Sequence, residues 1–84
     1  MRKVLVVDDE FLVRVGIKSF LNWEENGYTI IGEAADGGHA LEIMERELPE
    51  VVLTDLKMDG MDGFELIQVS RKRFPTVQFV VLSS

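Results

Sequence analysis

The chain has 84 residues and a formal net charge of −6 at pH 7, and 46% of its residues are hydrophobic. This composition is typical of one small globular domain and excludes a largely disordered chain. The acidic charge argues against direct nucleic-acid contact, because such surfaces carry a basic stripe. The absence of cysteine excludes disulfides and thiolate metal sites. No stretch resembles a membrane span or a signal peptide, so a cytoplasmic protein is expected.

The first strand and helix are predicted from an apolar run followed by acids. Residues 3–7 contain four consecutive aliphatic side chains, which is typical of a strand buried on both faces. A helix is expected from about Glu10 to about Leu21, with Arg14 and Lys18 facing outward. Its apolar stripe is predicted to comprise Val13, Ile17, Phe20 and Leu21.

A polar connection leads to the second strand and helix. Trp23 is expected to pack as a lid over the first helix, and Gly27 is expected in the C-terminal turn of that helix. The second strand is predicted over residues 28–35, and Asp36 is positioned to cap a helix over residues 38–48. The apolar stripe of this second helix is predicted to comprise Leu41, Met44 and Leu48.

The third strand–helix pair and a fourth strand complete the pattern. The third strand is predicted over residues 51–54, and a loop over residues 55–61 follows it. A capping box that begins at Asp62 is expected to open a helix that extends to about Phe74. The fourth strand is predicted over residues 78–82. Strands that alternate with helices predict an α/β fold with a parallel sheet and right-handed crossovers.

Polar residues follow three of the predicted strands directly. Asp8 and Asp9 follow the first strand, Asp55 follows the third, and Ser83 follows the fourth. Because the carboxyl ends of parallel strands meet at one edge of the sheet, these side chains are expected to converge. Three close carboxylates repel one another unless a cation neutralises them, and oxygen ligands without His or Cys favour Mg²⁺ or Mn²⁺. A carboxylate in such a site can become an aspartyl phosphate, with a hydroxyl as a nearby donor.

Simpler interpretations of the same residues stay open from the sequence. Asp8 and Asp9 precede a predicted helix and could serve as caps, and Asp55 could be an ordinary loop acid. Asp62 is interpreted as a cap, and Asp59 as a turn residue, rather than as ligands. Ser83 could be no more than a solvated serine near the chain end.

Three motifs together resemble one protein family. Residues 4–10 (VLVVDDE), 52–63 (VLTDLKMDGMDG) and 79–83 (FVVLS) are similar to the receiver domain of two-component response regulators. The resemblance implies that Asp55 is the phosphoacceptor. It implies that Asp8, Asp9, Asp55 and the backbone carbonyl of Lys57 hold Mg²⁺. It also implies that Ser83 is the switch hydroxyl, and that a phosphohistidine on a sensor histidine kinase is the donor.

The resemblance implies a flavodoxin-like three-layer fold with strand order 2-1-3-4. Residues 14–25 and 32–37 are similar to regulators whose output is an AraC-type DNA-binding domain. Two departures stand out: Asp59 follows Met58 where the family has proline, and the chain ends before the fifth strand, which carries a lysine in the family. We therefore expect an incomplete receiver domain over residues 1–84. We also expect it to be unstable as a monomer and able to associate through its fourth strand or its uncovered sheet face.

Two rival functions remain open from the sequence. A Mg²⁺-dependent phosphatase of the haloacid-dehalogenase type also uses an aspartyl nucleophile after a strand, but it places a second acid two residues later. Here Glu10 follows Asp8 at that spacing with Asp9 between, which is a poor match. The other rival is an interaction module that never takes phosphate. The favoured prediction is a phosphorylation-controlled signalling domain rather than an enzyme that turns over a small substrate.

Overall fold

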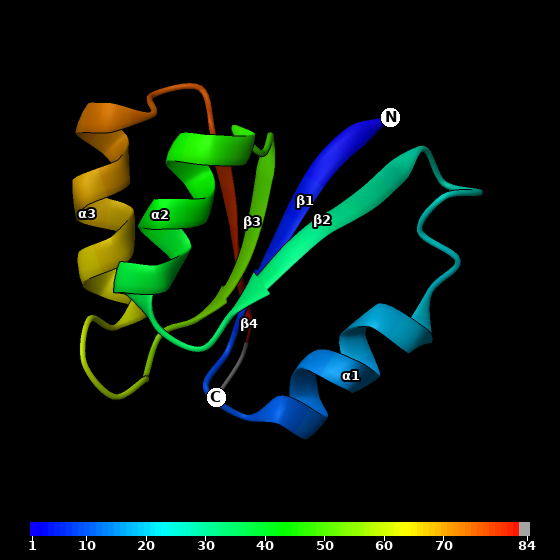
Figure 1. The fold of residues 1–84 in the computed structure, drawn as a ribbon, viewed down its shortest axis with the longest axis horizontal. Helices are drawn as coiled ribbons and strands as arrows, with labels where there is room; N and C mark the ends of the chain where they lie inside the picture. The colour runs from blue at the N-terminus through cyan, green and yellow to red at the C-terminus, as the bar shows by residue number, and fades with distance from the viewer. Residues whose placement is uncertain (83–84) are drawn as a thin grey trace.

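The computed structural model of the chain describes residues 1–82. These residues form a four-stranded parallel sheet with the order β2-β1-β3-β4. Helices α2 and α3 cover one face of the sheet and α1 lies on the other, which makes three layers (Figure 1). The predicted fold class and strand order are therefore confirmed. The elements are β1 (Arg2–Val7), α1 (Phe11–Phe20), β2 (Tyr28–Ala34), α2 (Gly37–Glu47), β3 (Val51–Asp55), α3 (Gly63–Arg73) and β4 (Gln78–Leu82).

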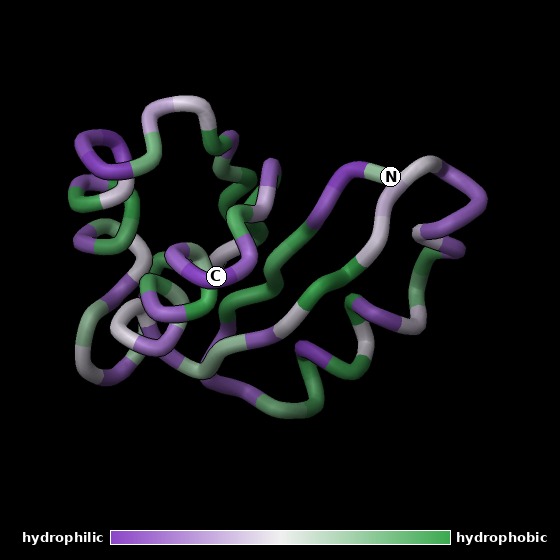
Figure 2. The backbone as a smooth tube through the Cα atoms, turned by 45° about the horizontal axis from the view of Figure 1, so that its top comes forward, coloured by the Kyte–Doolittle hydropathy of each residue, from purple (hydrophilic) through white to green (hydrophobic). Residues whose placement is uncertain are grey.

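The hydrophobic core lies on both faces of β1 and β3. The hydrophobic stretches of the chain run along the strands, and the hydrophilic stretches lie mainly in turns and on the outer faces of helices (Figure 2). The α2 and α3 face holds a cluster built from Leu5, Val7, Ala34, Ala40, Ile43, Met44, Val52 and Leu66. The α1 face holds a smaller cluster of Val4, Val6 and Leu53, against which Ile17 and Trp23 pack. Burial of residues 4–7 of β1 on both faces explains why this part of the strand is a continuous aliphatic run.

Helix α2 begins at its predicted cap but buries a different stripe. The carboxylate of Asp36 accepts a hydrogen bond of 2.8 Å from the backbone N–H of His39, which confirms the cap. The prediction that Leu48 faces the core was wrong, because 63% of Leu48 is exposed. Leu48 ends the helix in the left-handed conformation with a φ of 49°, which turns its side chain away from the sheet. The buried side of the helix comprises Gly37, Ala40, Ile43 and Met44.

Helix α1 packs less deeply than its apolar stripe predicted. None of its residues is fully buried, and 83% of Phe20 is exposed. The stripe does line one open apolar groove, together with Leu53 and Leu82 of the sheet. The predicted role of Gly27 was wrong, because α1 ends at Phe20 and Gly27 belongs to the turn before β2. Trp23 is confirmed as a lid, since its indole N–H donates to the carbonyl of Ile17 at 3.0 Å.

Strand β4 lies at one edge of the sheet. Within residues 1–82 the one strand that pairs with β4 is β3, and Val80 and Val81 are exposed. An exposed apolar edge strand is a surface on which another strand can pair. None of the helices in this part of the chain combines the length and the hydropathy that a membrane span requires.

Candidate functional site

The strand register brings the predicted acids together at one edge of the sheet. Val7 of β1 pairs with Thr54 of β3 in a parallel ladder, so the next residues along the two strands are Asp8 and Asp55. Asp9 follows Asp8, and the three residues each offer a carboxylate oxygen within 4.8 Å of the others. The site lies between β1 and β3. The strand order reverses here, since β2 lies on one side of β1 and β3 lies on the other, and folds of this kind bind ligands at such a point.

Asp8 is the buried member of this acidic cluster. Only 4% of the residue is exposed, and its backbone N–H donates to the carbonyl of Ala34 at 3.0 Å. Its carboxylate accepts a hydrogen bond of 2.9 Å from the backbone N–H of Glu10. Burial raises the pKa of Asp8 above its usual range, and the nearby charges of Asp55 and Asp9 raise the pKa further against the effect of that hydrogen bond. The negative charge of Asp8 is therefore costly unless a cation approaches.

Capping of α1 does not explain the acid pair. The residue that precedes the helix is Glu10, and no side chain caps the first turn. The cap interpretation of Asp8 and Asp9 was therefore wrong, whereas that of Asp62 is confirmed. The carboxylate of Asp62 accepts a hydrogen bond of 3.0 Å from the backbone N–H of Glu65 at the start of α3. With no helix to cap, the oxygens of Asp9 remain available to a ligand.

Two glycines allow the loop after β3 to lie close to its neighbours. The N–H of Gly63 donates to the carbonyl of Leu56 at 3.0 Å, and a Cβ on Gly63 would meet the carbonyl oxygen of Asp55 at 2.1 Å. The N–H of Gly37 similarly donates to the carbonyl of Met61 at 2.8 Å, where a Cβ would clash with the side chain and backbone of Met61. These contacts hold the backbone of the loop in place around the acidic cluster.

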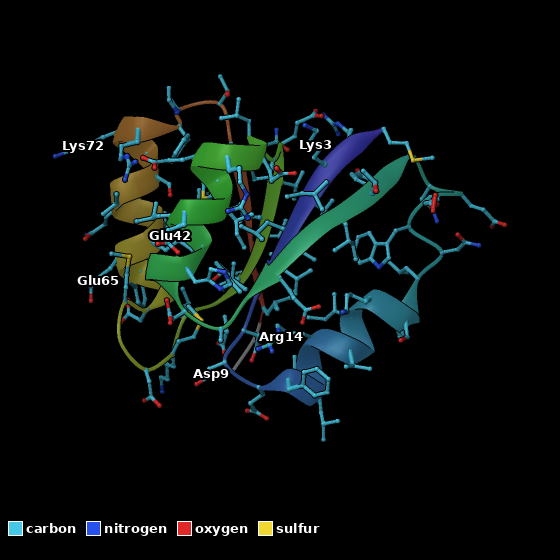
Figure 3. The ribbon with its side chains drawn as sticks, in the orientation of Figure 1. Lys3, Asp9, Arg14, Glu42, Glu65 and Lys72 are labelled. Carbon is cyan, nitrogen blue, oxygen red and sulfur yellow. The ribbon has the colours of Figure 1, made fainter. Side chains whose placement is uncertain are left out.

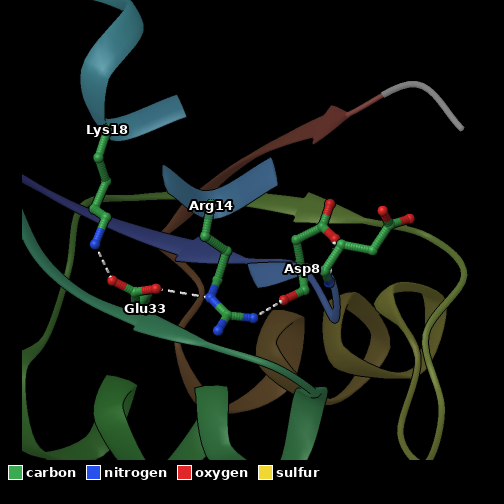
Figure 4. A network of polar contacts seen from close by, with 5 residues as sticks. Asp8, Arg14, Lys18 and Glu33 are labelled. Atoms are coloured by element: carbon green, nitrogen blue, oxygen red, sulfur yellow. Dashed lines mark hydrogen bonds and ion pairs between the residues drawn. The ribbon is translucent and has the colours of Figure 1, made fainter. Parts of the chain in front are cut away.

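Arg14 was missed as a residue of the site by the sequence reasoning. It was expected to face outward with Lys18, but only 14% of its side chain is exposed. Arg14 lies between Glu33 and the backbone of Asp8, and Lys18 pairs with the other oxygen of Glu33 (Figure 4). Both cations lower the pKa of Glu33, and the hydrogen bond from Lys18 has the larger effect. The spacing of four residues places both cations on one helix face, and this was the available signal.

Arg14 and Asp9 lie at the same end of the molecule, and Lys3 and Lys72 lie at the opposite end (Figure 3). Within the part of the chain that the structure describes, three carboxylates, those of Asp8, Asp9 and Asp55, converge at this end. A set of carboxylate oxygens without His or Cys is a ligand set that suits Mg²⁺ or Mn²⁺. The residues present thus fit a small divalent cation.

The remaining two predicted site residues are less constrained. Lys57 lies in the loop after β3, and its N–H donates to the carboxylate of Asp55 at 3.4 Å. Its backbone carbonyl as a metal ligand stays a prediction. Ser83 lies outside the described residues, so its role as a switch hydroxyl stays a prediction as well.

Replacement of Asp8 by asparagine is expected to stabilise the metal-free chain at neutral pH. A carboxyl with a raised pKa binds its proton more tightly in the folded state, so metal-free stability falls as pH rises above the ordinary value of 3.8. Asparagine keeps the oxygen that accepts from Glu10 but carries no charge. The gain should be on the order of 1 kcal/mol at pH 7 and should disappear near pH 3. Thermal melting with a chelator at both pH values measures it, and a lower melting temperature at pH 7 would contradict the expectation.

The sequence matches the family described as the response regulator receiver domain over residues 4–84. The chain is 43% identical over 83 residues to the uncharacterized transcriptional regulatory protein YesN of Bacillus subtilis. This alignment covers 99% of the present chain and 23% of YesN. It is 39% identical over 82 residues to the response regulator protein VraR of Staphylococcus saprophyticus. That alignment covers 98% of the present chain and 39% of VraR. The chain thus spans less than half the length of these relatives.

Solved structures give the same result. The structure is similar to the receiver domain of AraT, a response regulator from Geobacillus stearothermophilus, with a TM-score of 0.91 and 38% identity over 95% of this chain and 62% of that one. It is also similar to the response regulator domain of Thermotoga maritima CheB, with a TM-score of 0.83 and 30% identity over 96% of this chain and 60% of that one. The haloacid-dehalogenase alternative finds no support here. The chain belongs to the family of response regulator receiver domains.

Proposed function

We propose that this receiver domain accepts a phosphoryl group on Asp55 in a reaction that depends on a divalent cation. Asp8, Asp9 and Asp55, with the backbone carbonyl of Lys57, would hold Mg²⁺ or Mn²⁺. The bound ion would neutralise the carboxylates and the oxygens of the transferring phosphoryl group. The observation that carries this proposal is the convergence of three carboxylates from β1 and β3 within 4.8 Å, one of them buried.

Burial and position would give Asp55, Asp8 and Ser83 different roles in phosphoryl transfer. Asp55 ends β3 and is partly exposed, so an incoming phosphorus atom can reach one of its oxygens. That oxygen forms a new bond to phosphorus while the bond between phosphorus and the donor breaks, and the donor keeps the electron pair. Asp8 is buried behind this position, and its fixed carboxylate orients ligands rather than reacting. The hydroxyl of Ser83 would act as a donor to the phosphoryl oxygens.

The wider setting is inferred from the relatives. We propose a sensor histidine kinase as the phosphoryl donor, with the phosphate carried on a histidine whose imidazole leaves when the P–N bond breaks. Residues 1–84 would belong to a receiver domain that lies in the cytoplasm, and they would make no direct contact with nucleic acid. Relatives named transcriptional regulatory protein support control of transcription as the output of the whole protein, with an AraC-type output domain. Association of copies through β4 or through the uncovered sheet face stays a prediction.

Intact mass after incubation with acetyl phosphate tests the function. The chain is expected to gain one phosphoryl group in the presence of MgCl₂ and none in the presence of a chelator. The adduct should be lost on treatment with hydroxylamine, because an aspartyl phosphate is a reactive acyl phosphate. A folded chain that stays unmodified with saturating Mg²⁺ would contradict the proposal. An adduct that forms equally with the chelator would contradict the role of the cation.

A further inference from the structure

We propose that Arg14 is a positioning residue that sets the metal affinity of the acid pair without touching the metal. The inference rests on the function proposed above. Arg14 donates from Nη1 to the backbone carbonyl of Asp8 at 2.6 Å and from Nε to the carboxylate of Glu33 at 2.7 Å (Figure 4). One partly buried guanidinium therefore ties the end of β1 to β2 and to its own helix.

The turn that presents Asp9 depends on the position of Asp8. The N–H of Asp8 is bound to the carbonyl of Ala34, and its carboxylate is bound to the N–H of Glu10. Within residues 1–82, Arg14 is the one residue whose side chain donates to the backbone of this turn. No side-chain cap holds the first turn of α1, which begins directly afterwards. Loss of Arg14 would thus leave the carbonyl between the two acids without its side-chain donor and loosen the turn that presents Asp9.

The choice of acceptor matters for the chemistry. At the acidic cluster Arg14 binds the backbone carbonyl of Asp8 and not its carboxylate, so the cluster keeps its carboxylate oxygens for a cation. Glu33 pairs with both Arg14 and Lys18, so its negative charge partly offsets theirs and its carboxylate fixes the guanidinium. The planar fork of arginine can satisfy two acceptors at once, and lysine cannot reproduce that geometry.

Charge and position predict opposite effects of removing Arg14. A cation close to the site repels Mg²⁺, so its loss would tighten Mg²⁺ binding if charge alone mattered. If Arg14 positions the acids, its loss weakens binding despite the more favourable charge. Residues that orient metal ligands typically change metal affinity by about 10- to 100-fold. The sign of the change therefore decides between the two effects.

The test is a calorimetric titration of the 84-residue chain with MgCl₂, together with thermal melting in a chelator. Arg14→Met is expected to weaken Mg²⁺ binding about tenfold. Lys18→Met is the matched control, because it removes the same charge and a contact to Glu33 but nothing from Asp8. It should leave the Mg²⁺ affinity unchanged or slightly higher. With acetyl phosphate, Arg14→Met should raise the Mg²⁺ concentration for half-maximal phosphorylation while the rate at saturating Mg²⁺ stays close to that of the wild type.

Each outcome bears on one proposal. Mg²⁺ affinity in Arg14→Met that equals or exceeds the wild-type value would overturn the positioning role, even if the melting temperature falls. If Arg14→Met does not fold, Arg14→Lys decides, since it keeps the charge but loses the fork. Wild-type affinity in Arg14→Lys would then overturn the inference. A wild-type chain whose Mg²⁺ binding is absent, or is unchanged by Asp55→Asn and Asp8→Asn, would contradict the proposed function instead.

Discussion

Replacement of Asp55 by asparagine is expected to abolish the phosphoryl adduct completely. The amide keeps the size of the carboxylate but lacks the anionic oxygen that would attack phosphorus. Asp55 is the one acidic residue of β3, so no other carboxylate on that strand can take its place. Mg²⁺ affinity should fall as well, because one of the three converging carboxylates is lost. Intact mass with acetyl phosphate and MgCl₂ measures the first effect, and calorimetry measures the second.

Asp59→Asn is the matched control for this substitution. Asp59 is an exposed acid in the loop after β3, so its replacement makes the same change of charge in the same loop. Asp59 is not part of the cluster of acids that converge within 4.8 Å. The control should keep the full adduct. If Asp55→Asn still gains one phosphoryl group, or if Asp59→Asn loses it, the phosphoacceptor is a different residue.

Replacement of Gly63 by alanine is expected to damage both the fold and the site. The new Cβ would lie 2.1 Å from the carbonyl oxygen of Asp55 and 2.9 Å from the Cα of Leu56. Both neighbours are backbone atoms, so either α3 or the end of β3 must move. The free energy of unfolding should fall by about 2–3 kcal/mol, which lowers the melting temperature by roughly 10–15 °C in a domain of this size. Displacement of Asp55 should also slow phosphorylation about 100-fold.

Gly16→Ala is the control with the opposite expected sign. Gly16 lies inside α1, and a Cβ there would meet no atom within 4 Å. Alanine in a helix interior gains about 0.5–1 kcal/mol over glycine, so the melting temperature should rise slightly and phosphorylation should not change. Thermal melting and the rate of adduct formation compare the two variants. A Gly63→Ala chain that melts and reacts like the wild type would show that the loop accommodates the methyl group without moving Asp55.

Much of the fold was predictable because its signals are local. The buried run before Asp8 predicted a strand, and strands that alternate with helices predicted a parallel sheet. The caps at Asp36 and Asp62 were predictable because a cap and the N–H that it accepts lie three residues apart. The acidic cluster was predictable because the carboxyl ends of parallel strands share one edge, so acids after two neighbouring strands must converge.

Two errors of the sequence reasoning concern burial at the ends of helices. Phe20 and Leu48 continued the apolar stripes of their helices, and both are exposed. Periodicity identifies one side of a helix, but the amount of burial depends on what lies opposite that side. Helix α1 lies over an open groove, and Leu48 adopts the left-handed conformation after the last turn of α2. Neither circumstance is encoded in the spacing of apolar residues.

The sequence by itself determined the order of the elements, the edge of the sheet that carries the site, and the three acids that meet there. Each depends on strand period, on capping and on the direction of parallel strands, all of which are properties of neighbouring residues. Only the tertiary structure decided that Arg14 turns inward to the carbonyl of Asp8 and to Glu33, and that Gly63 touches Asp55. These contacts depend on how closely two elements pack once the sheet has formed, and that distance is set by all the side chains between them.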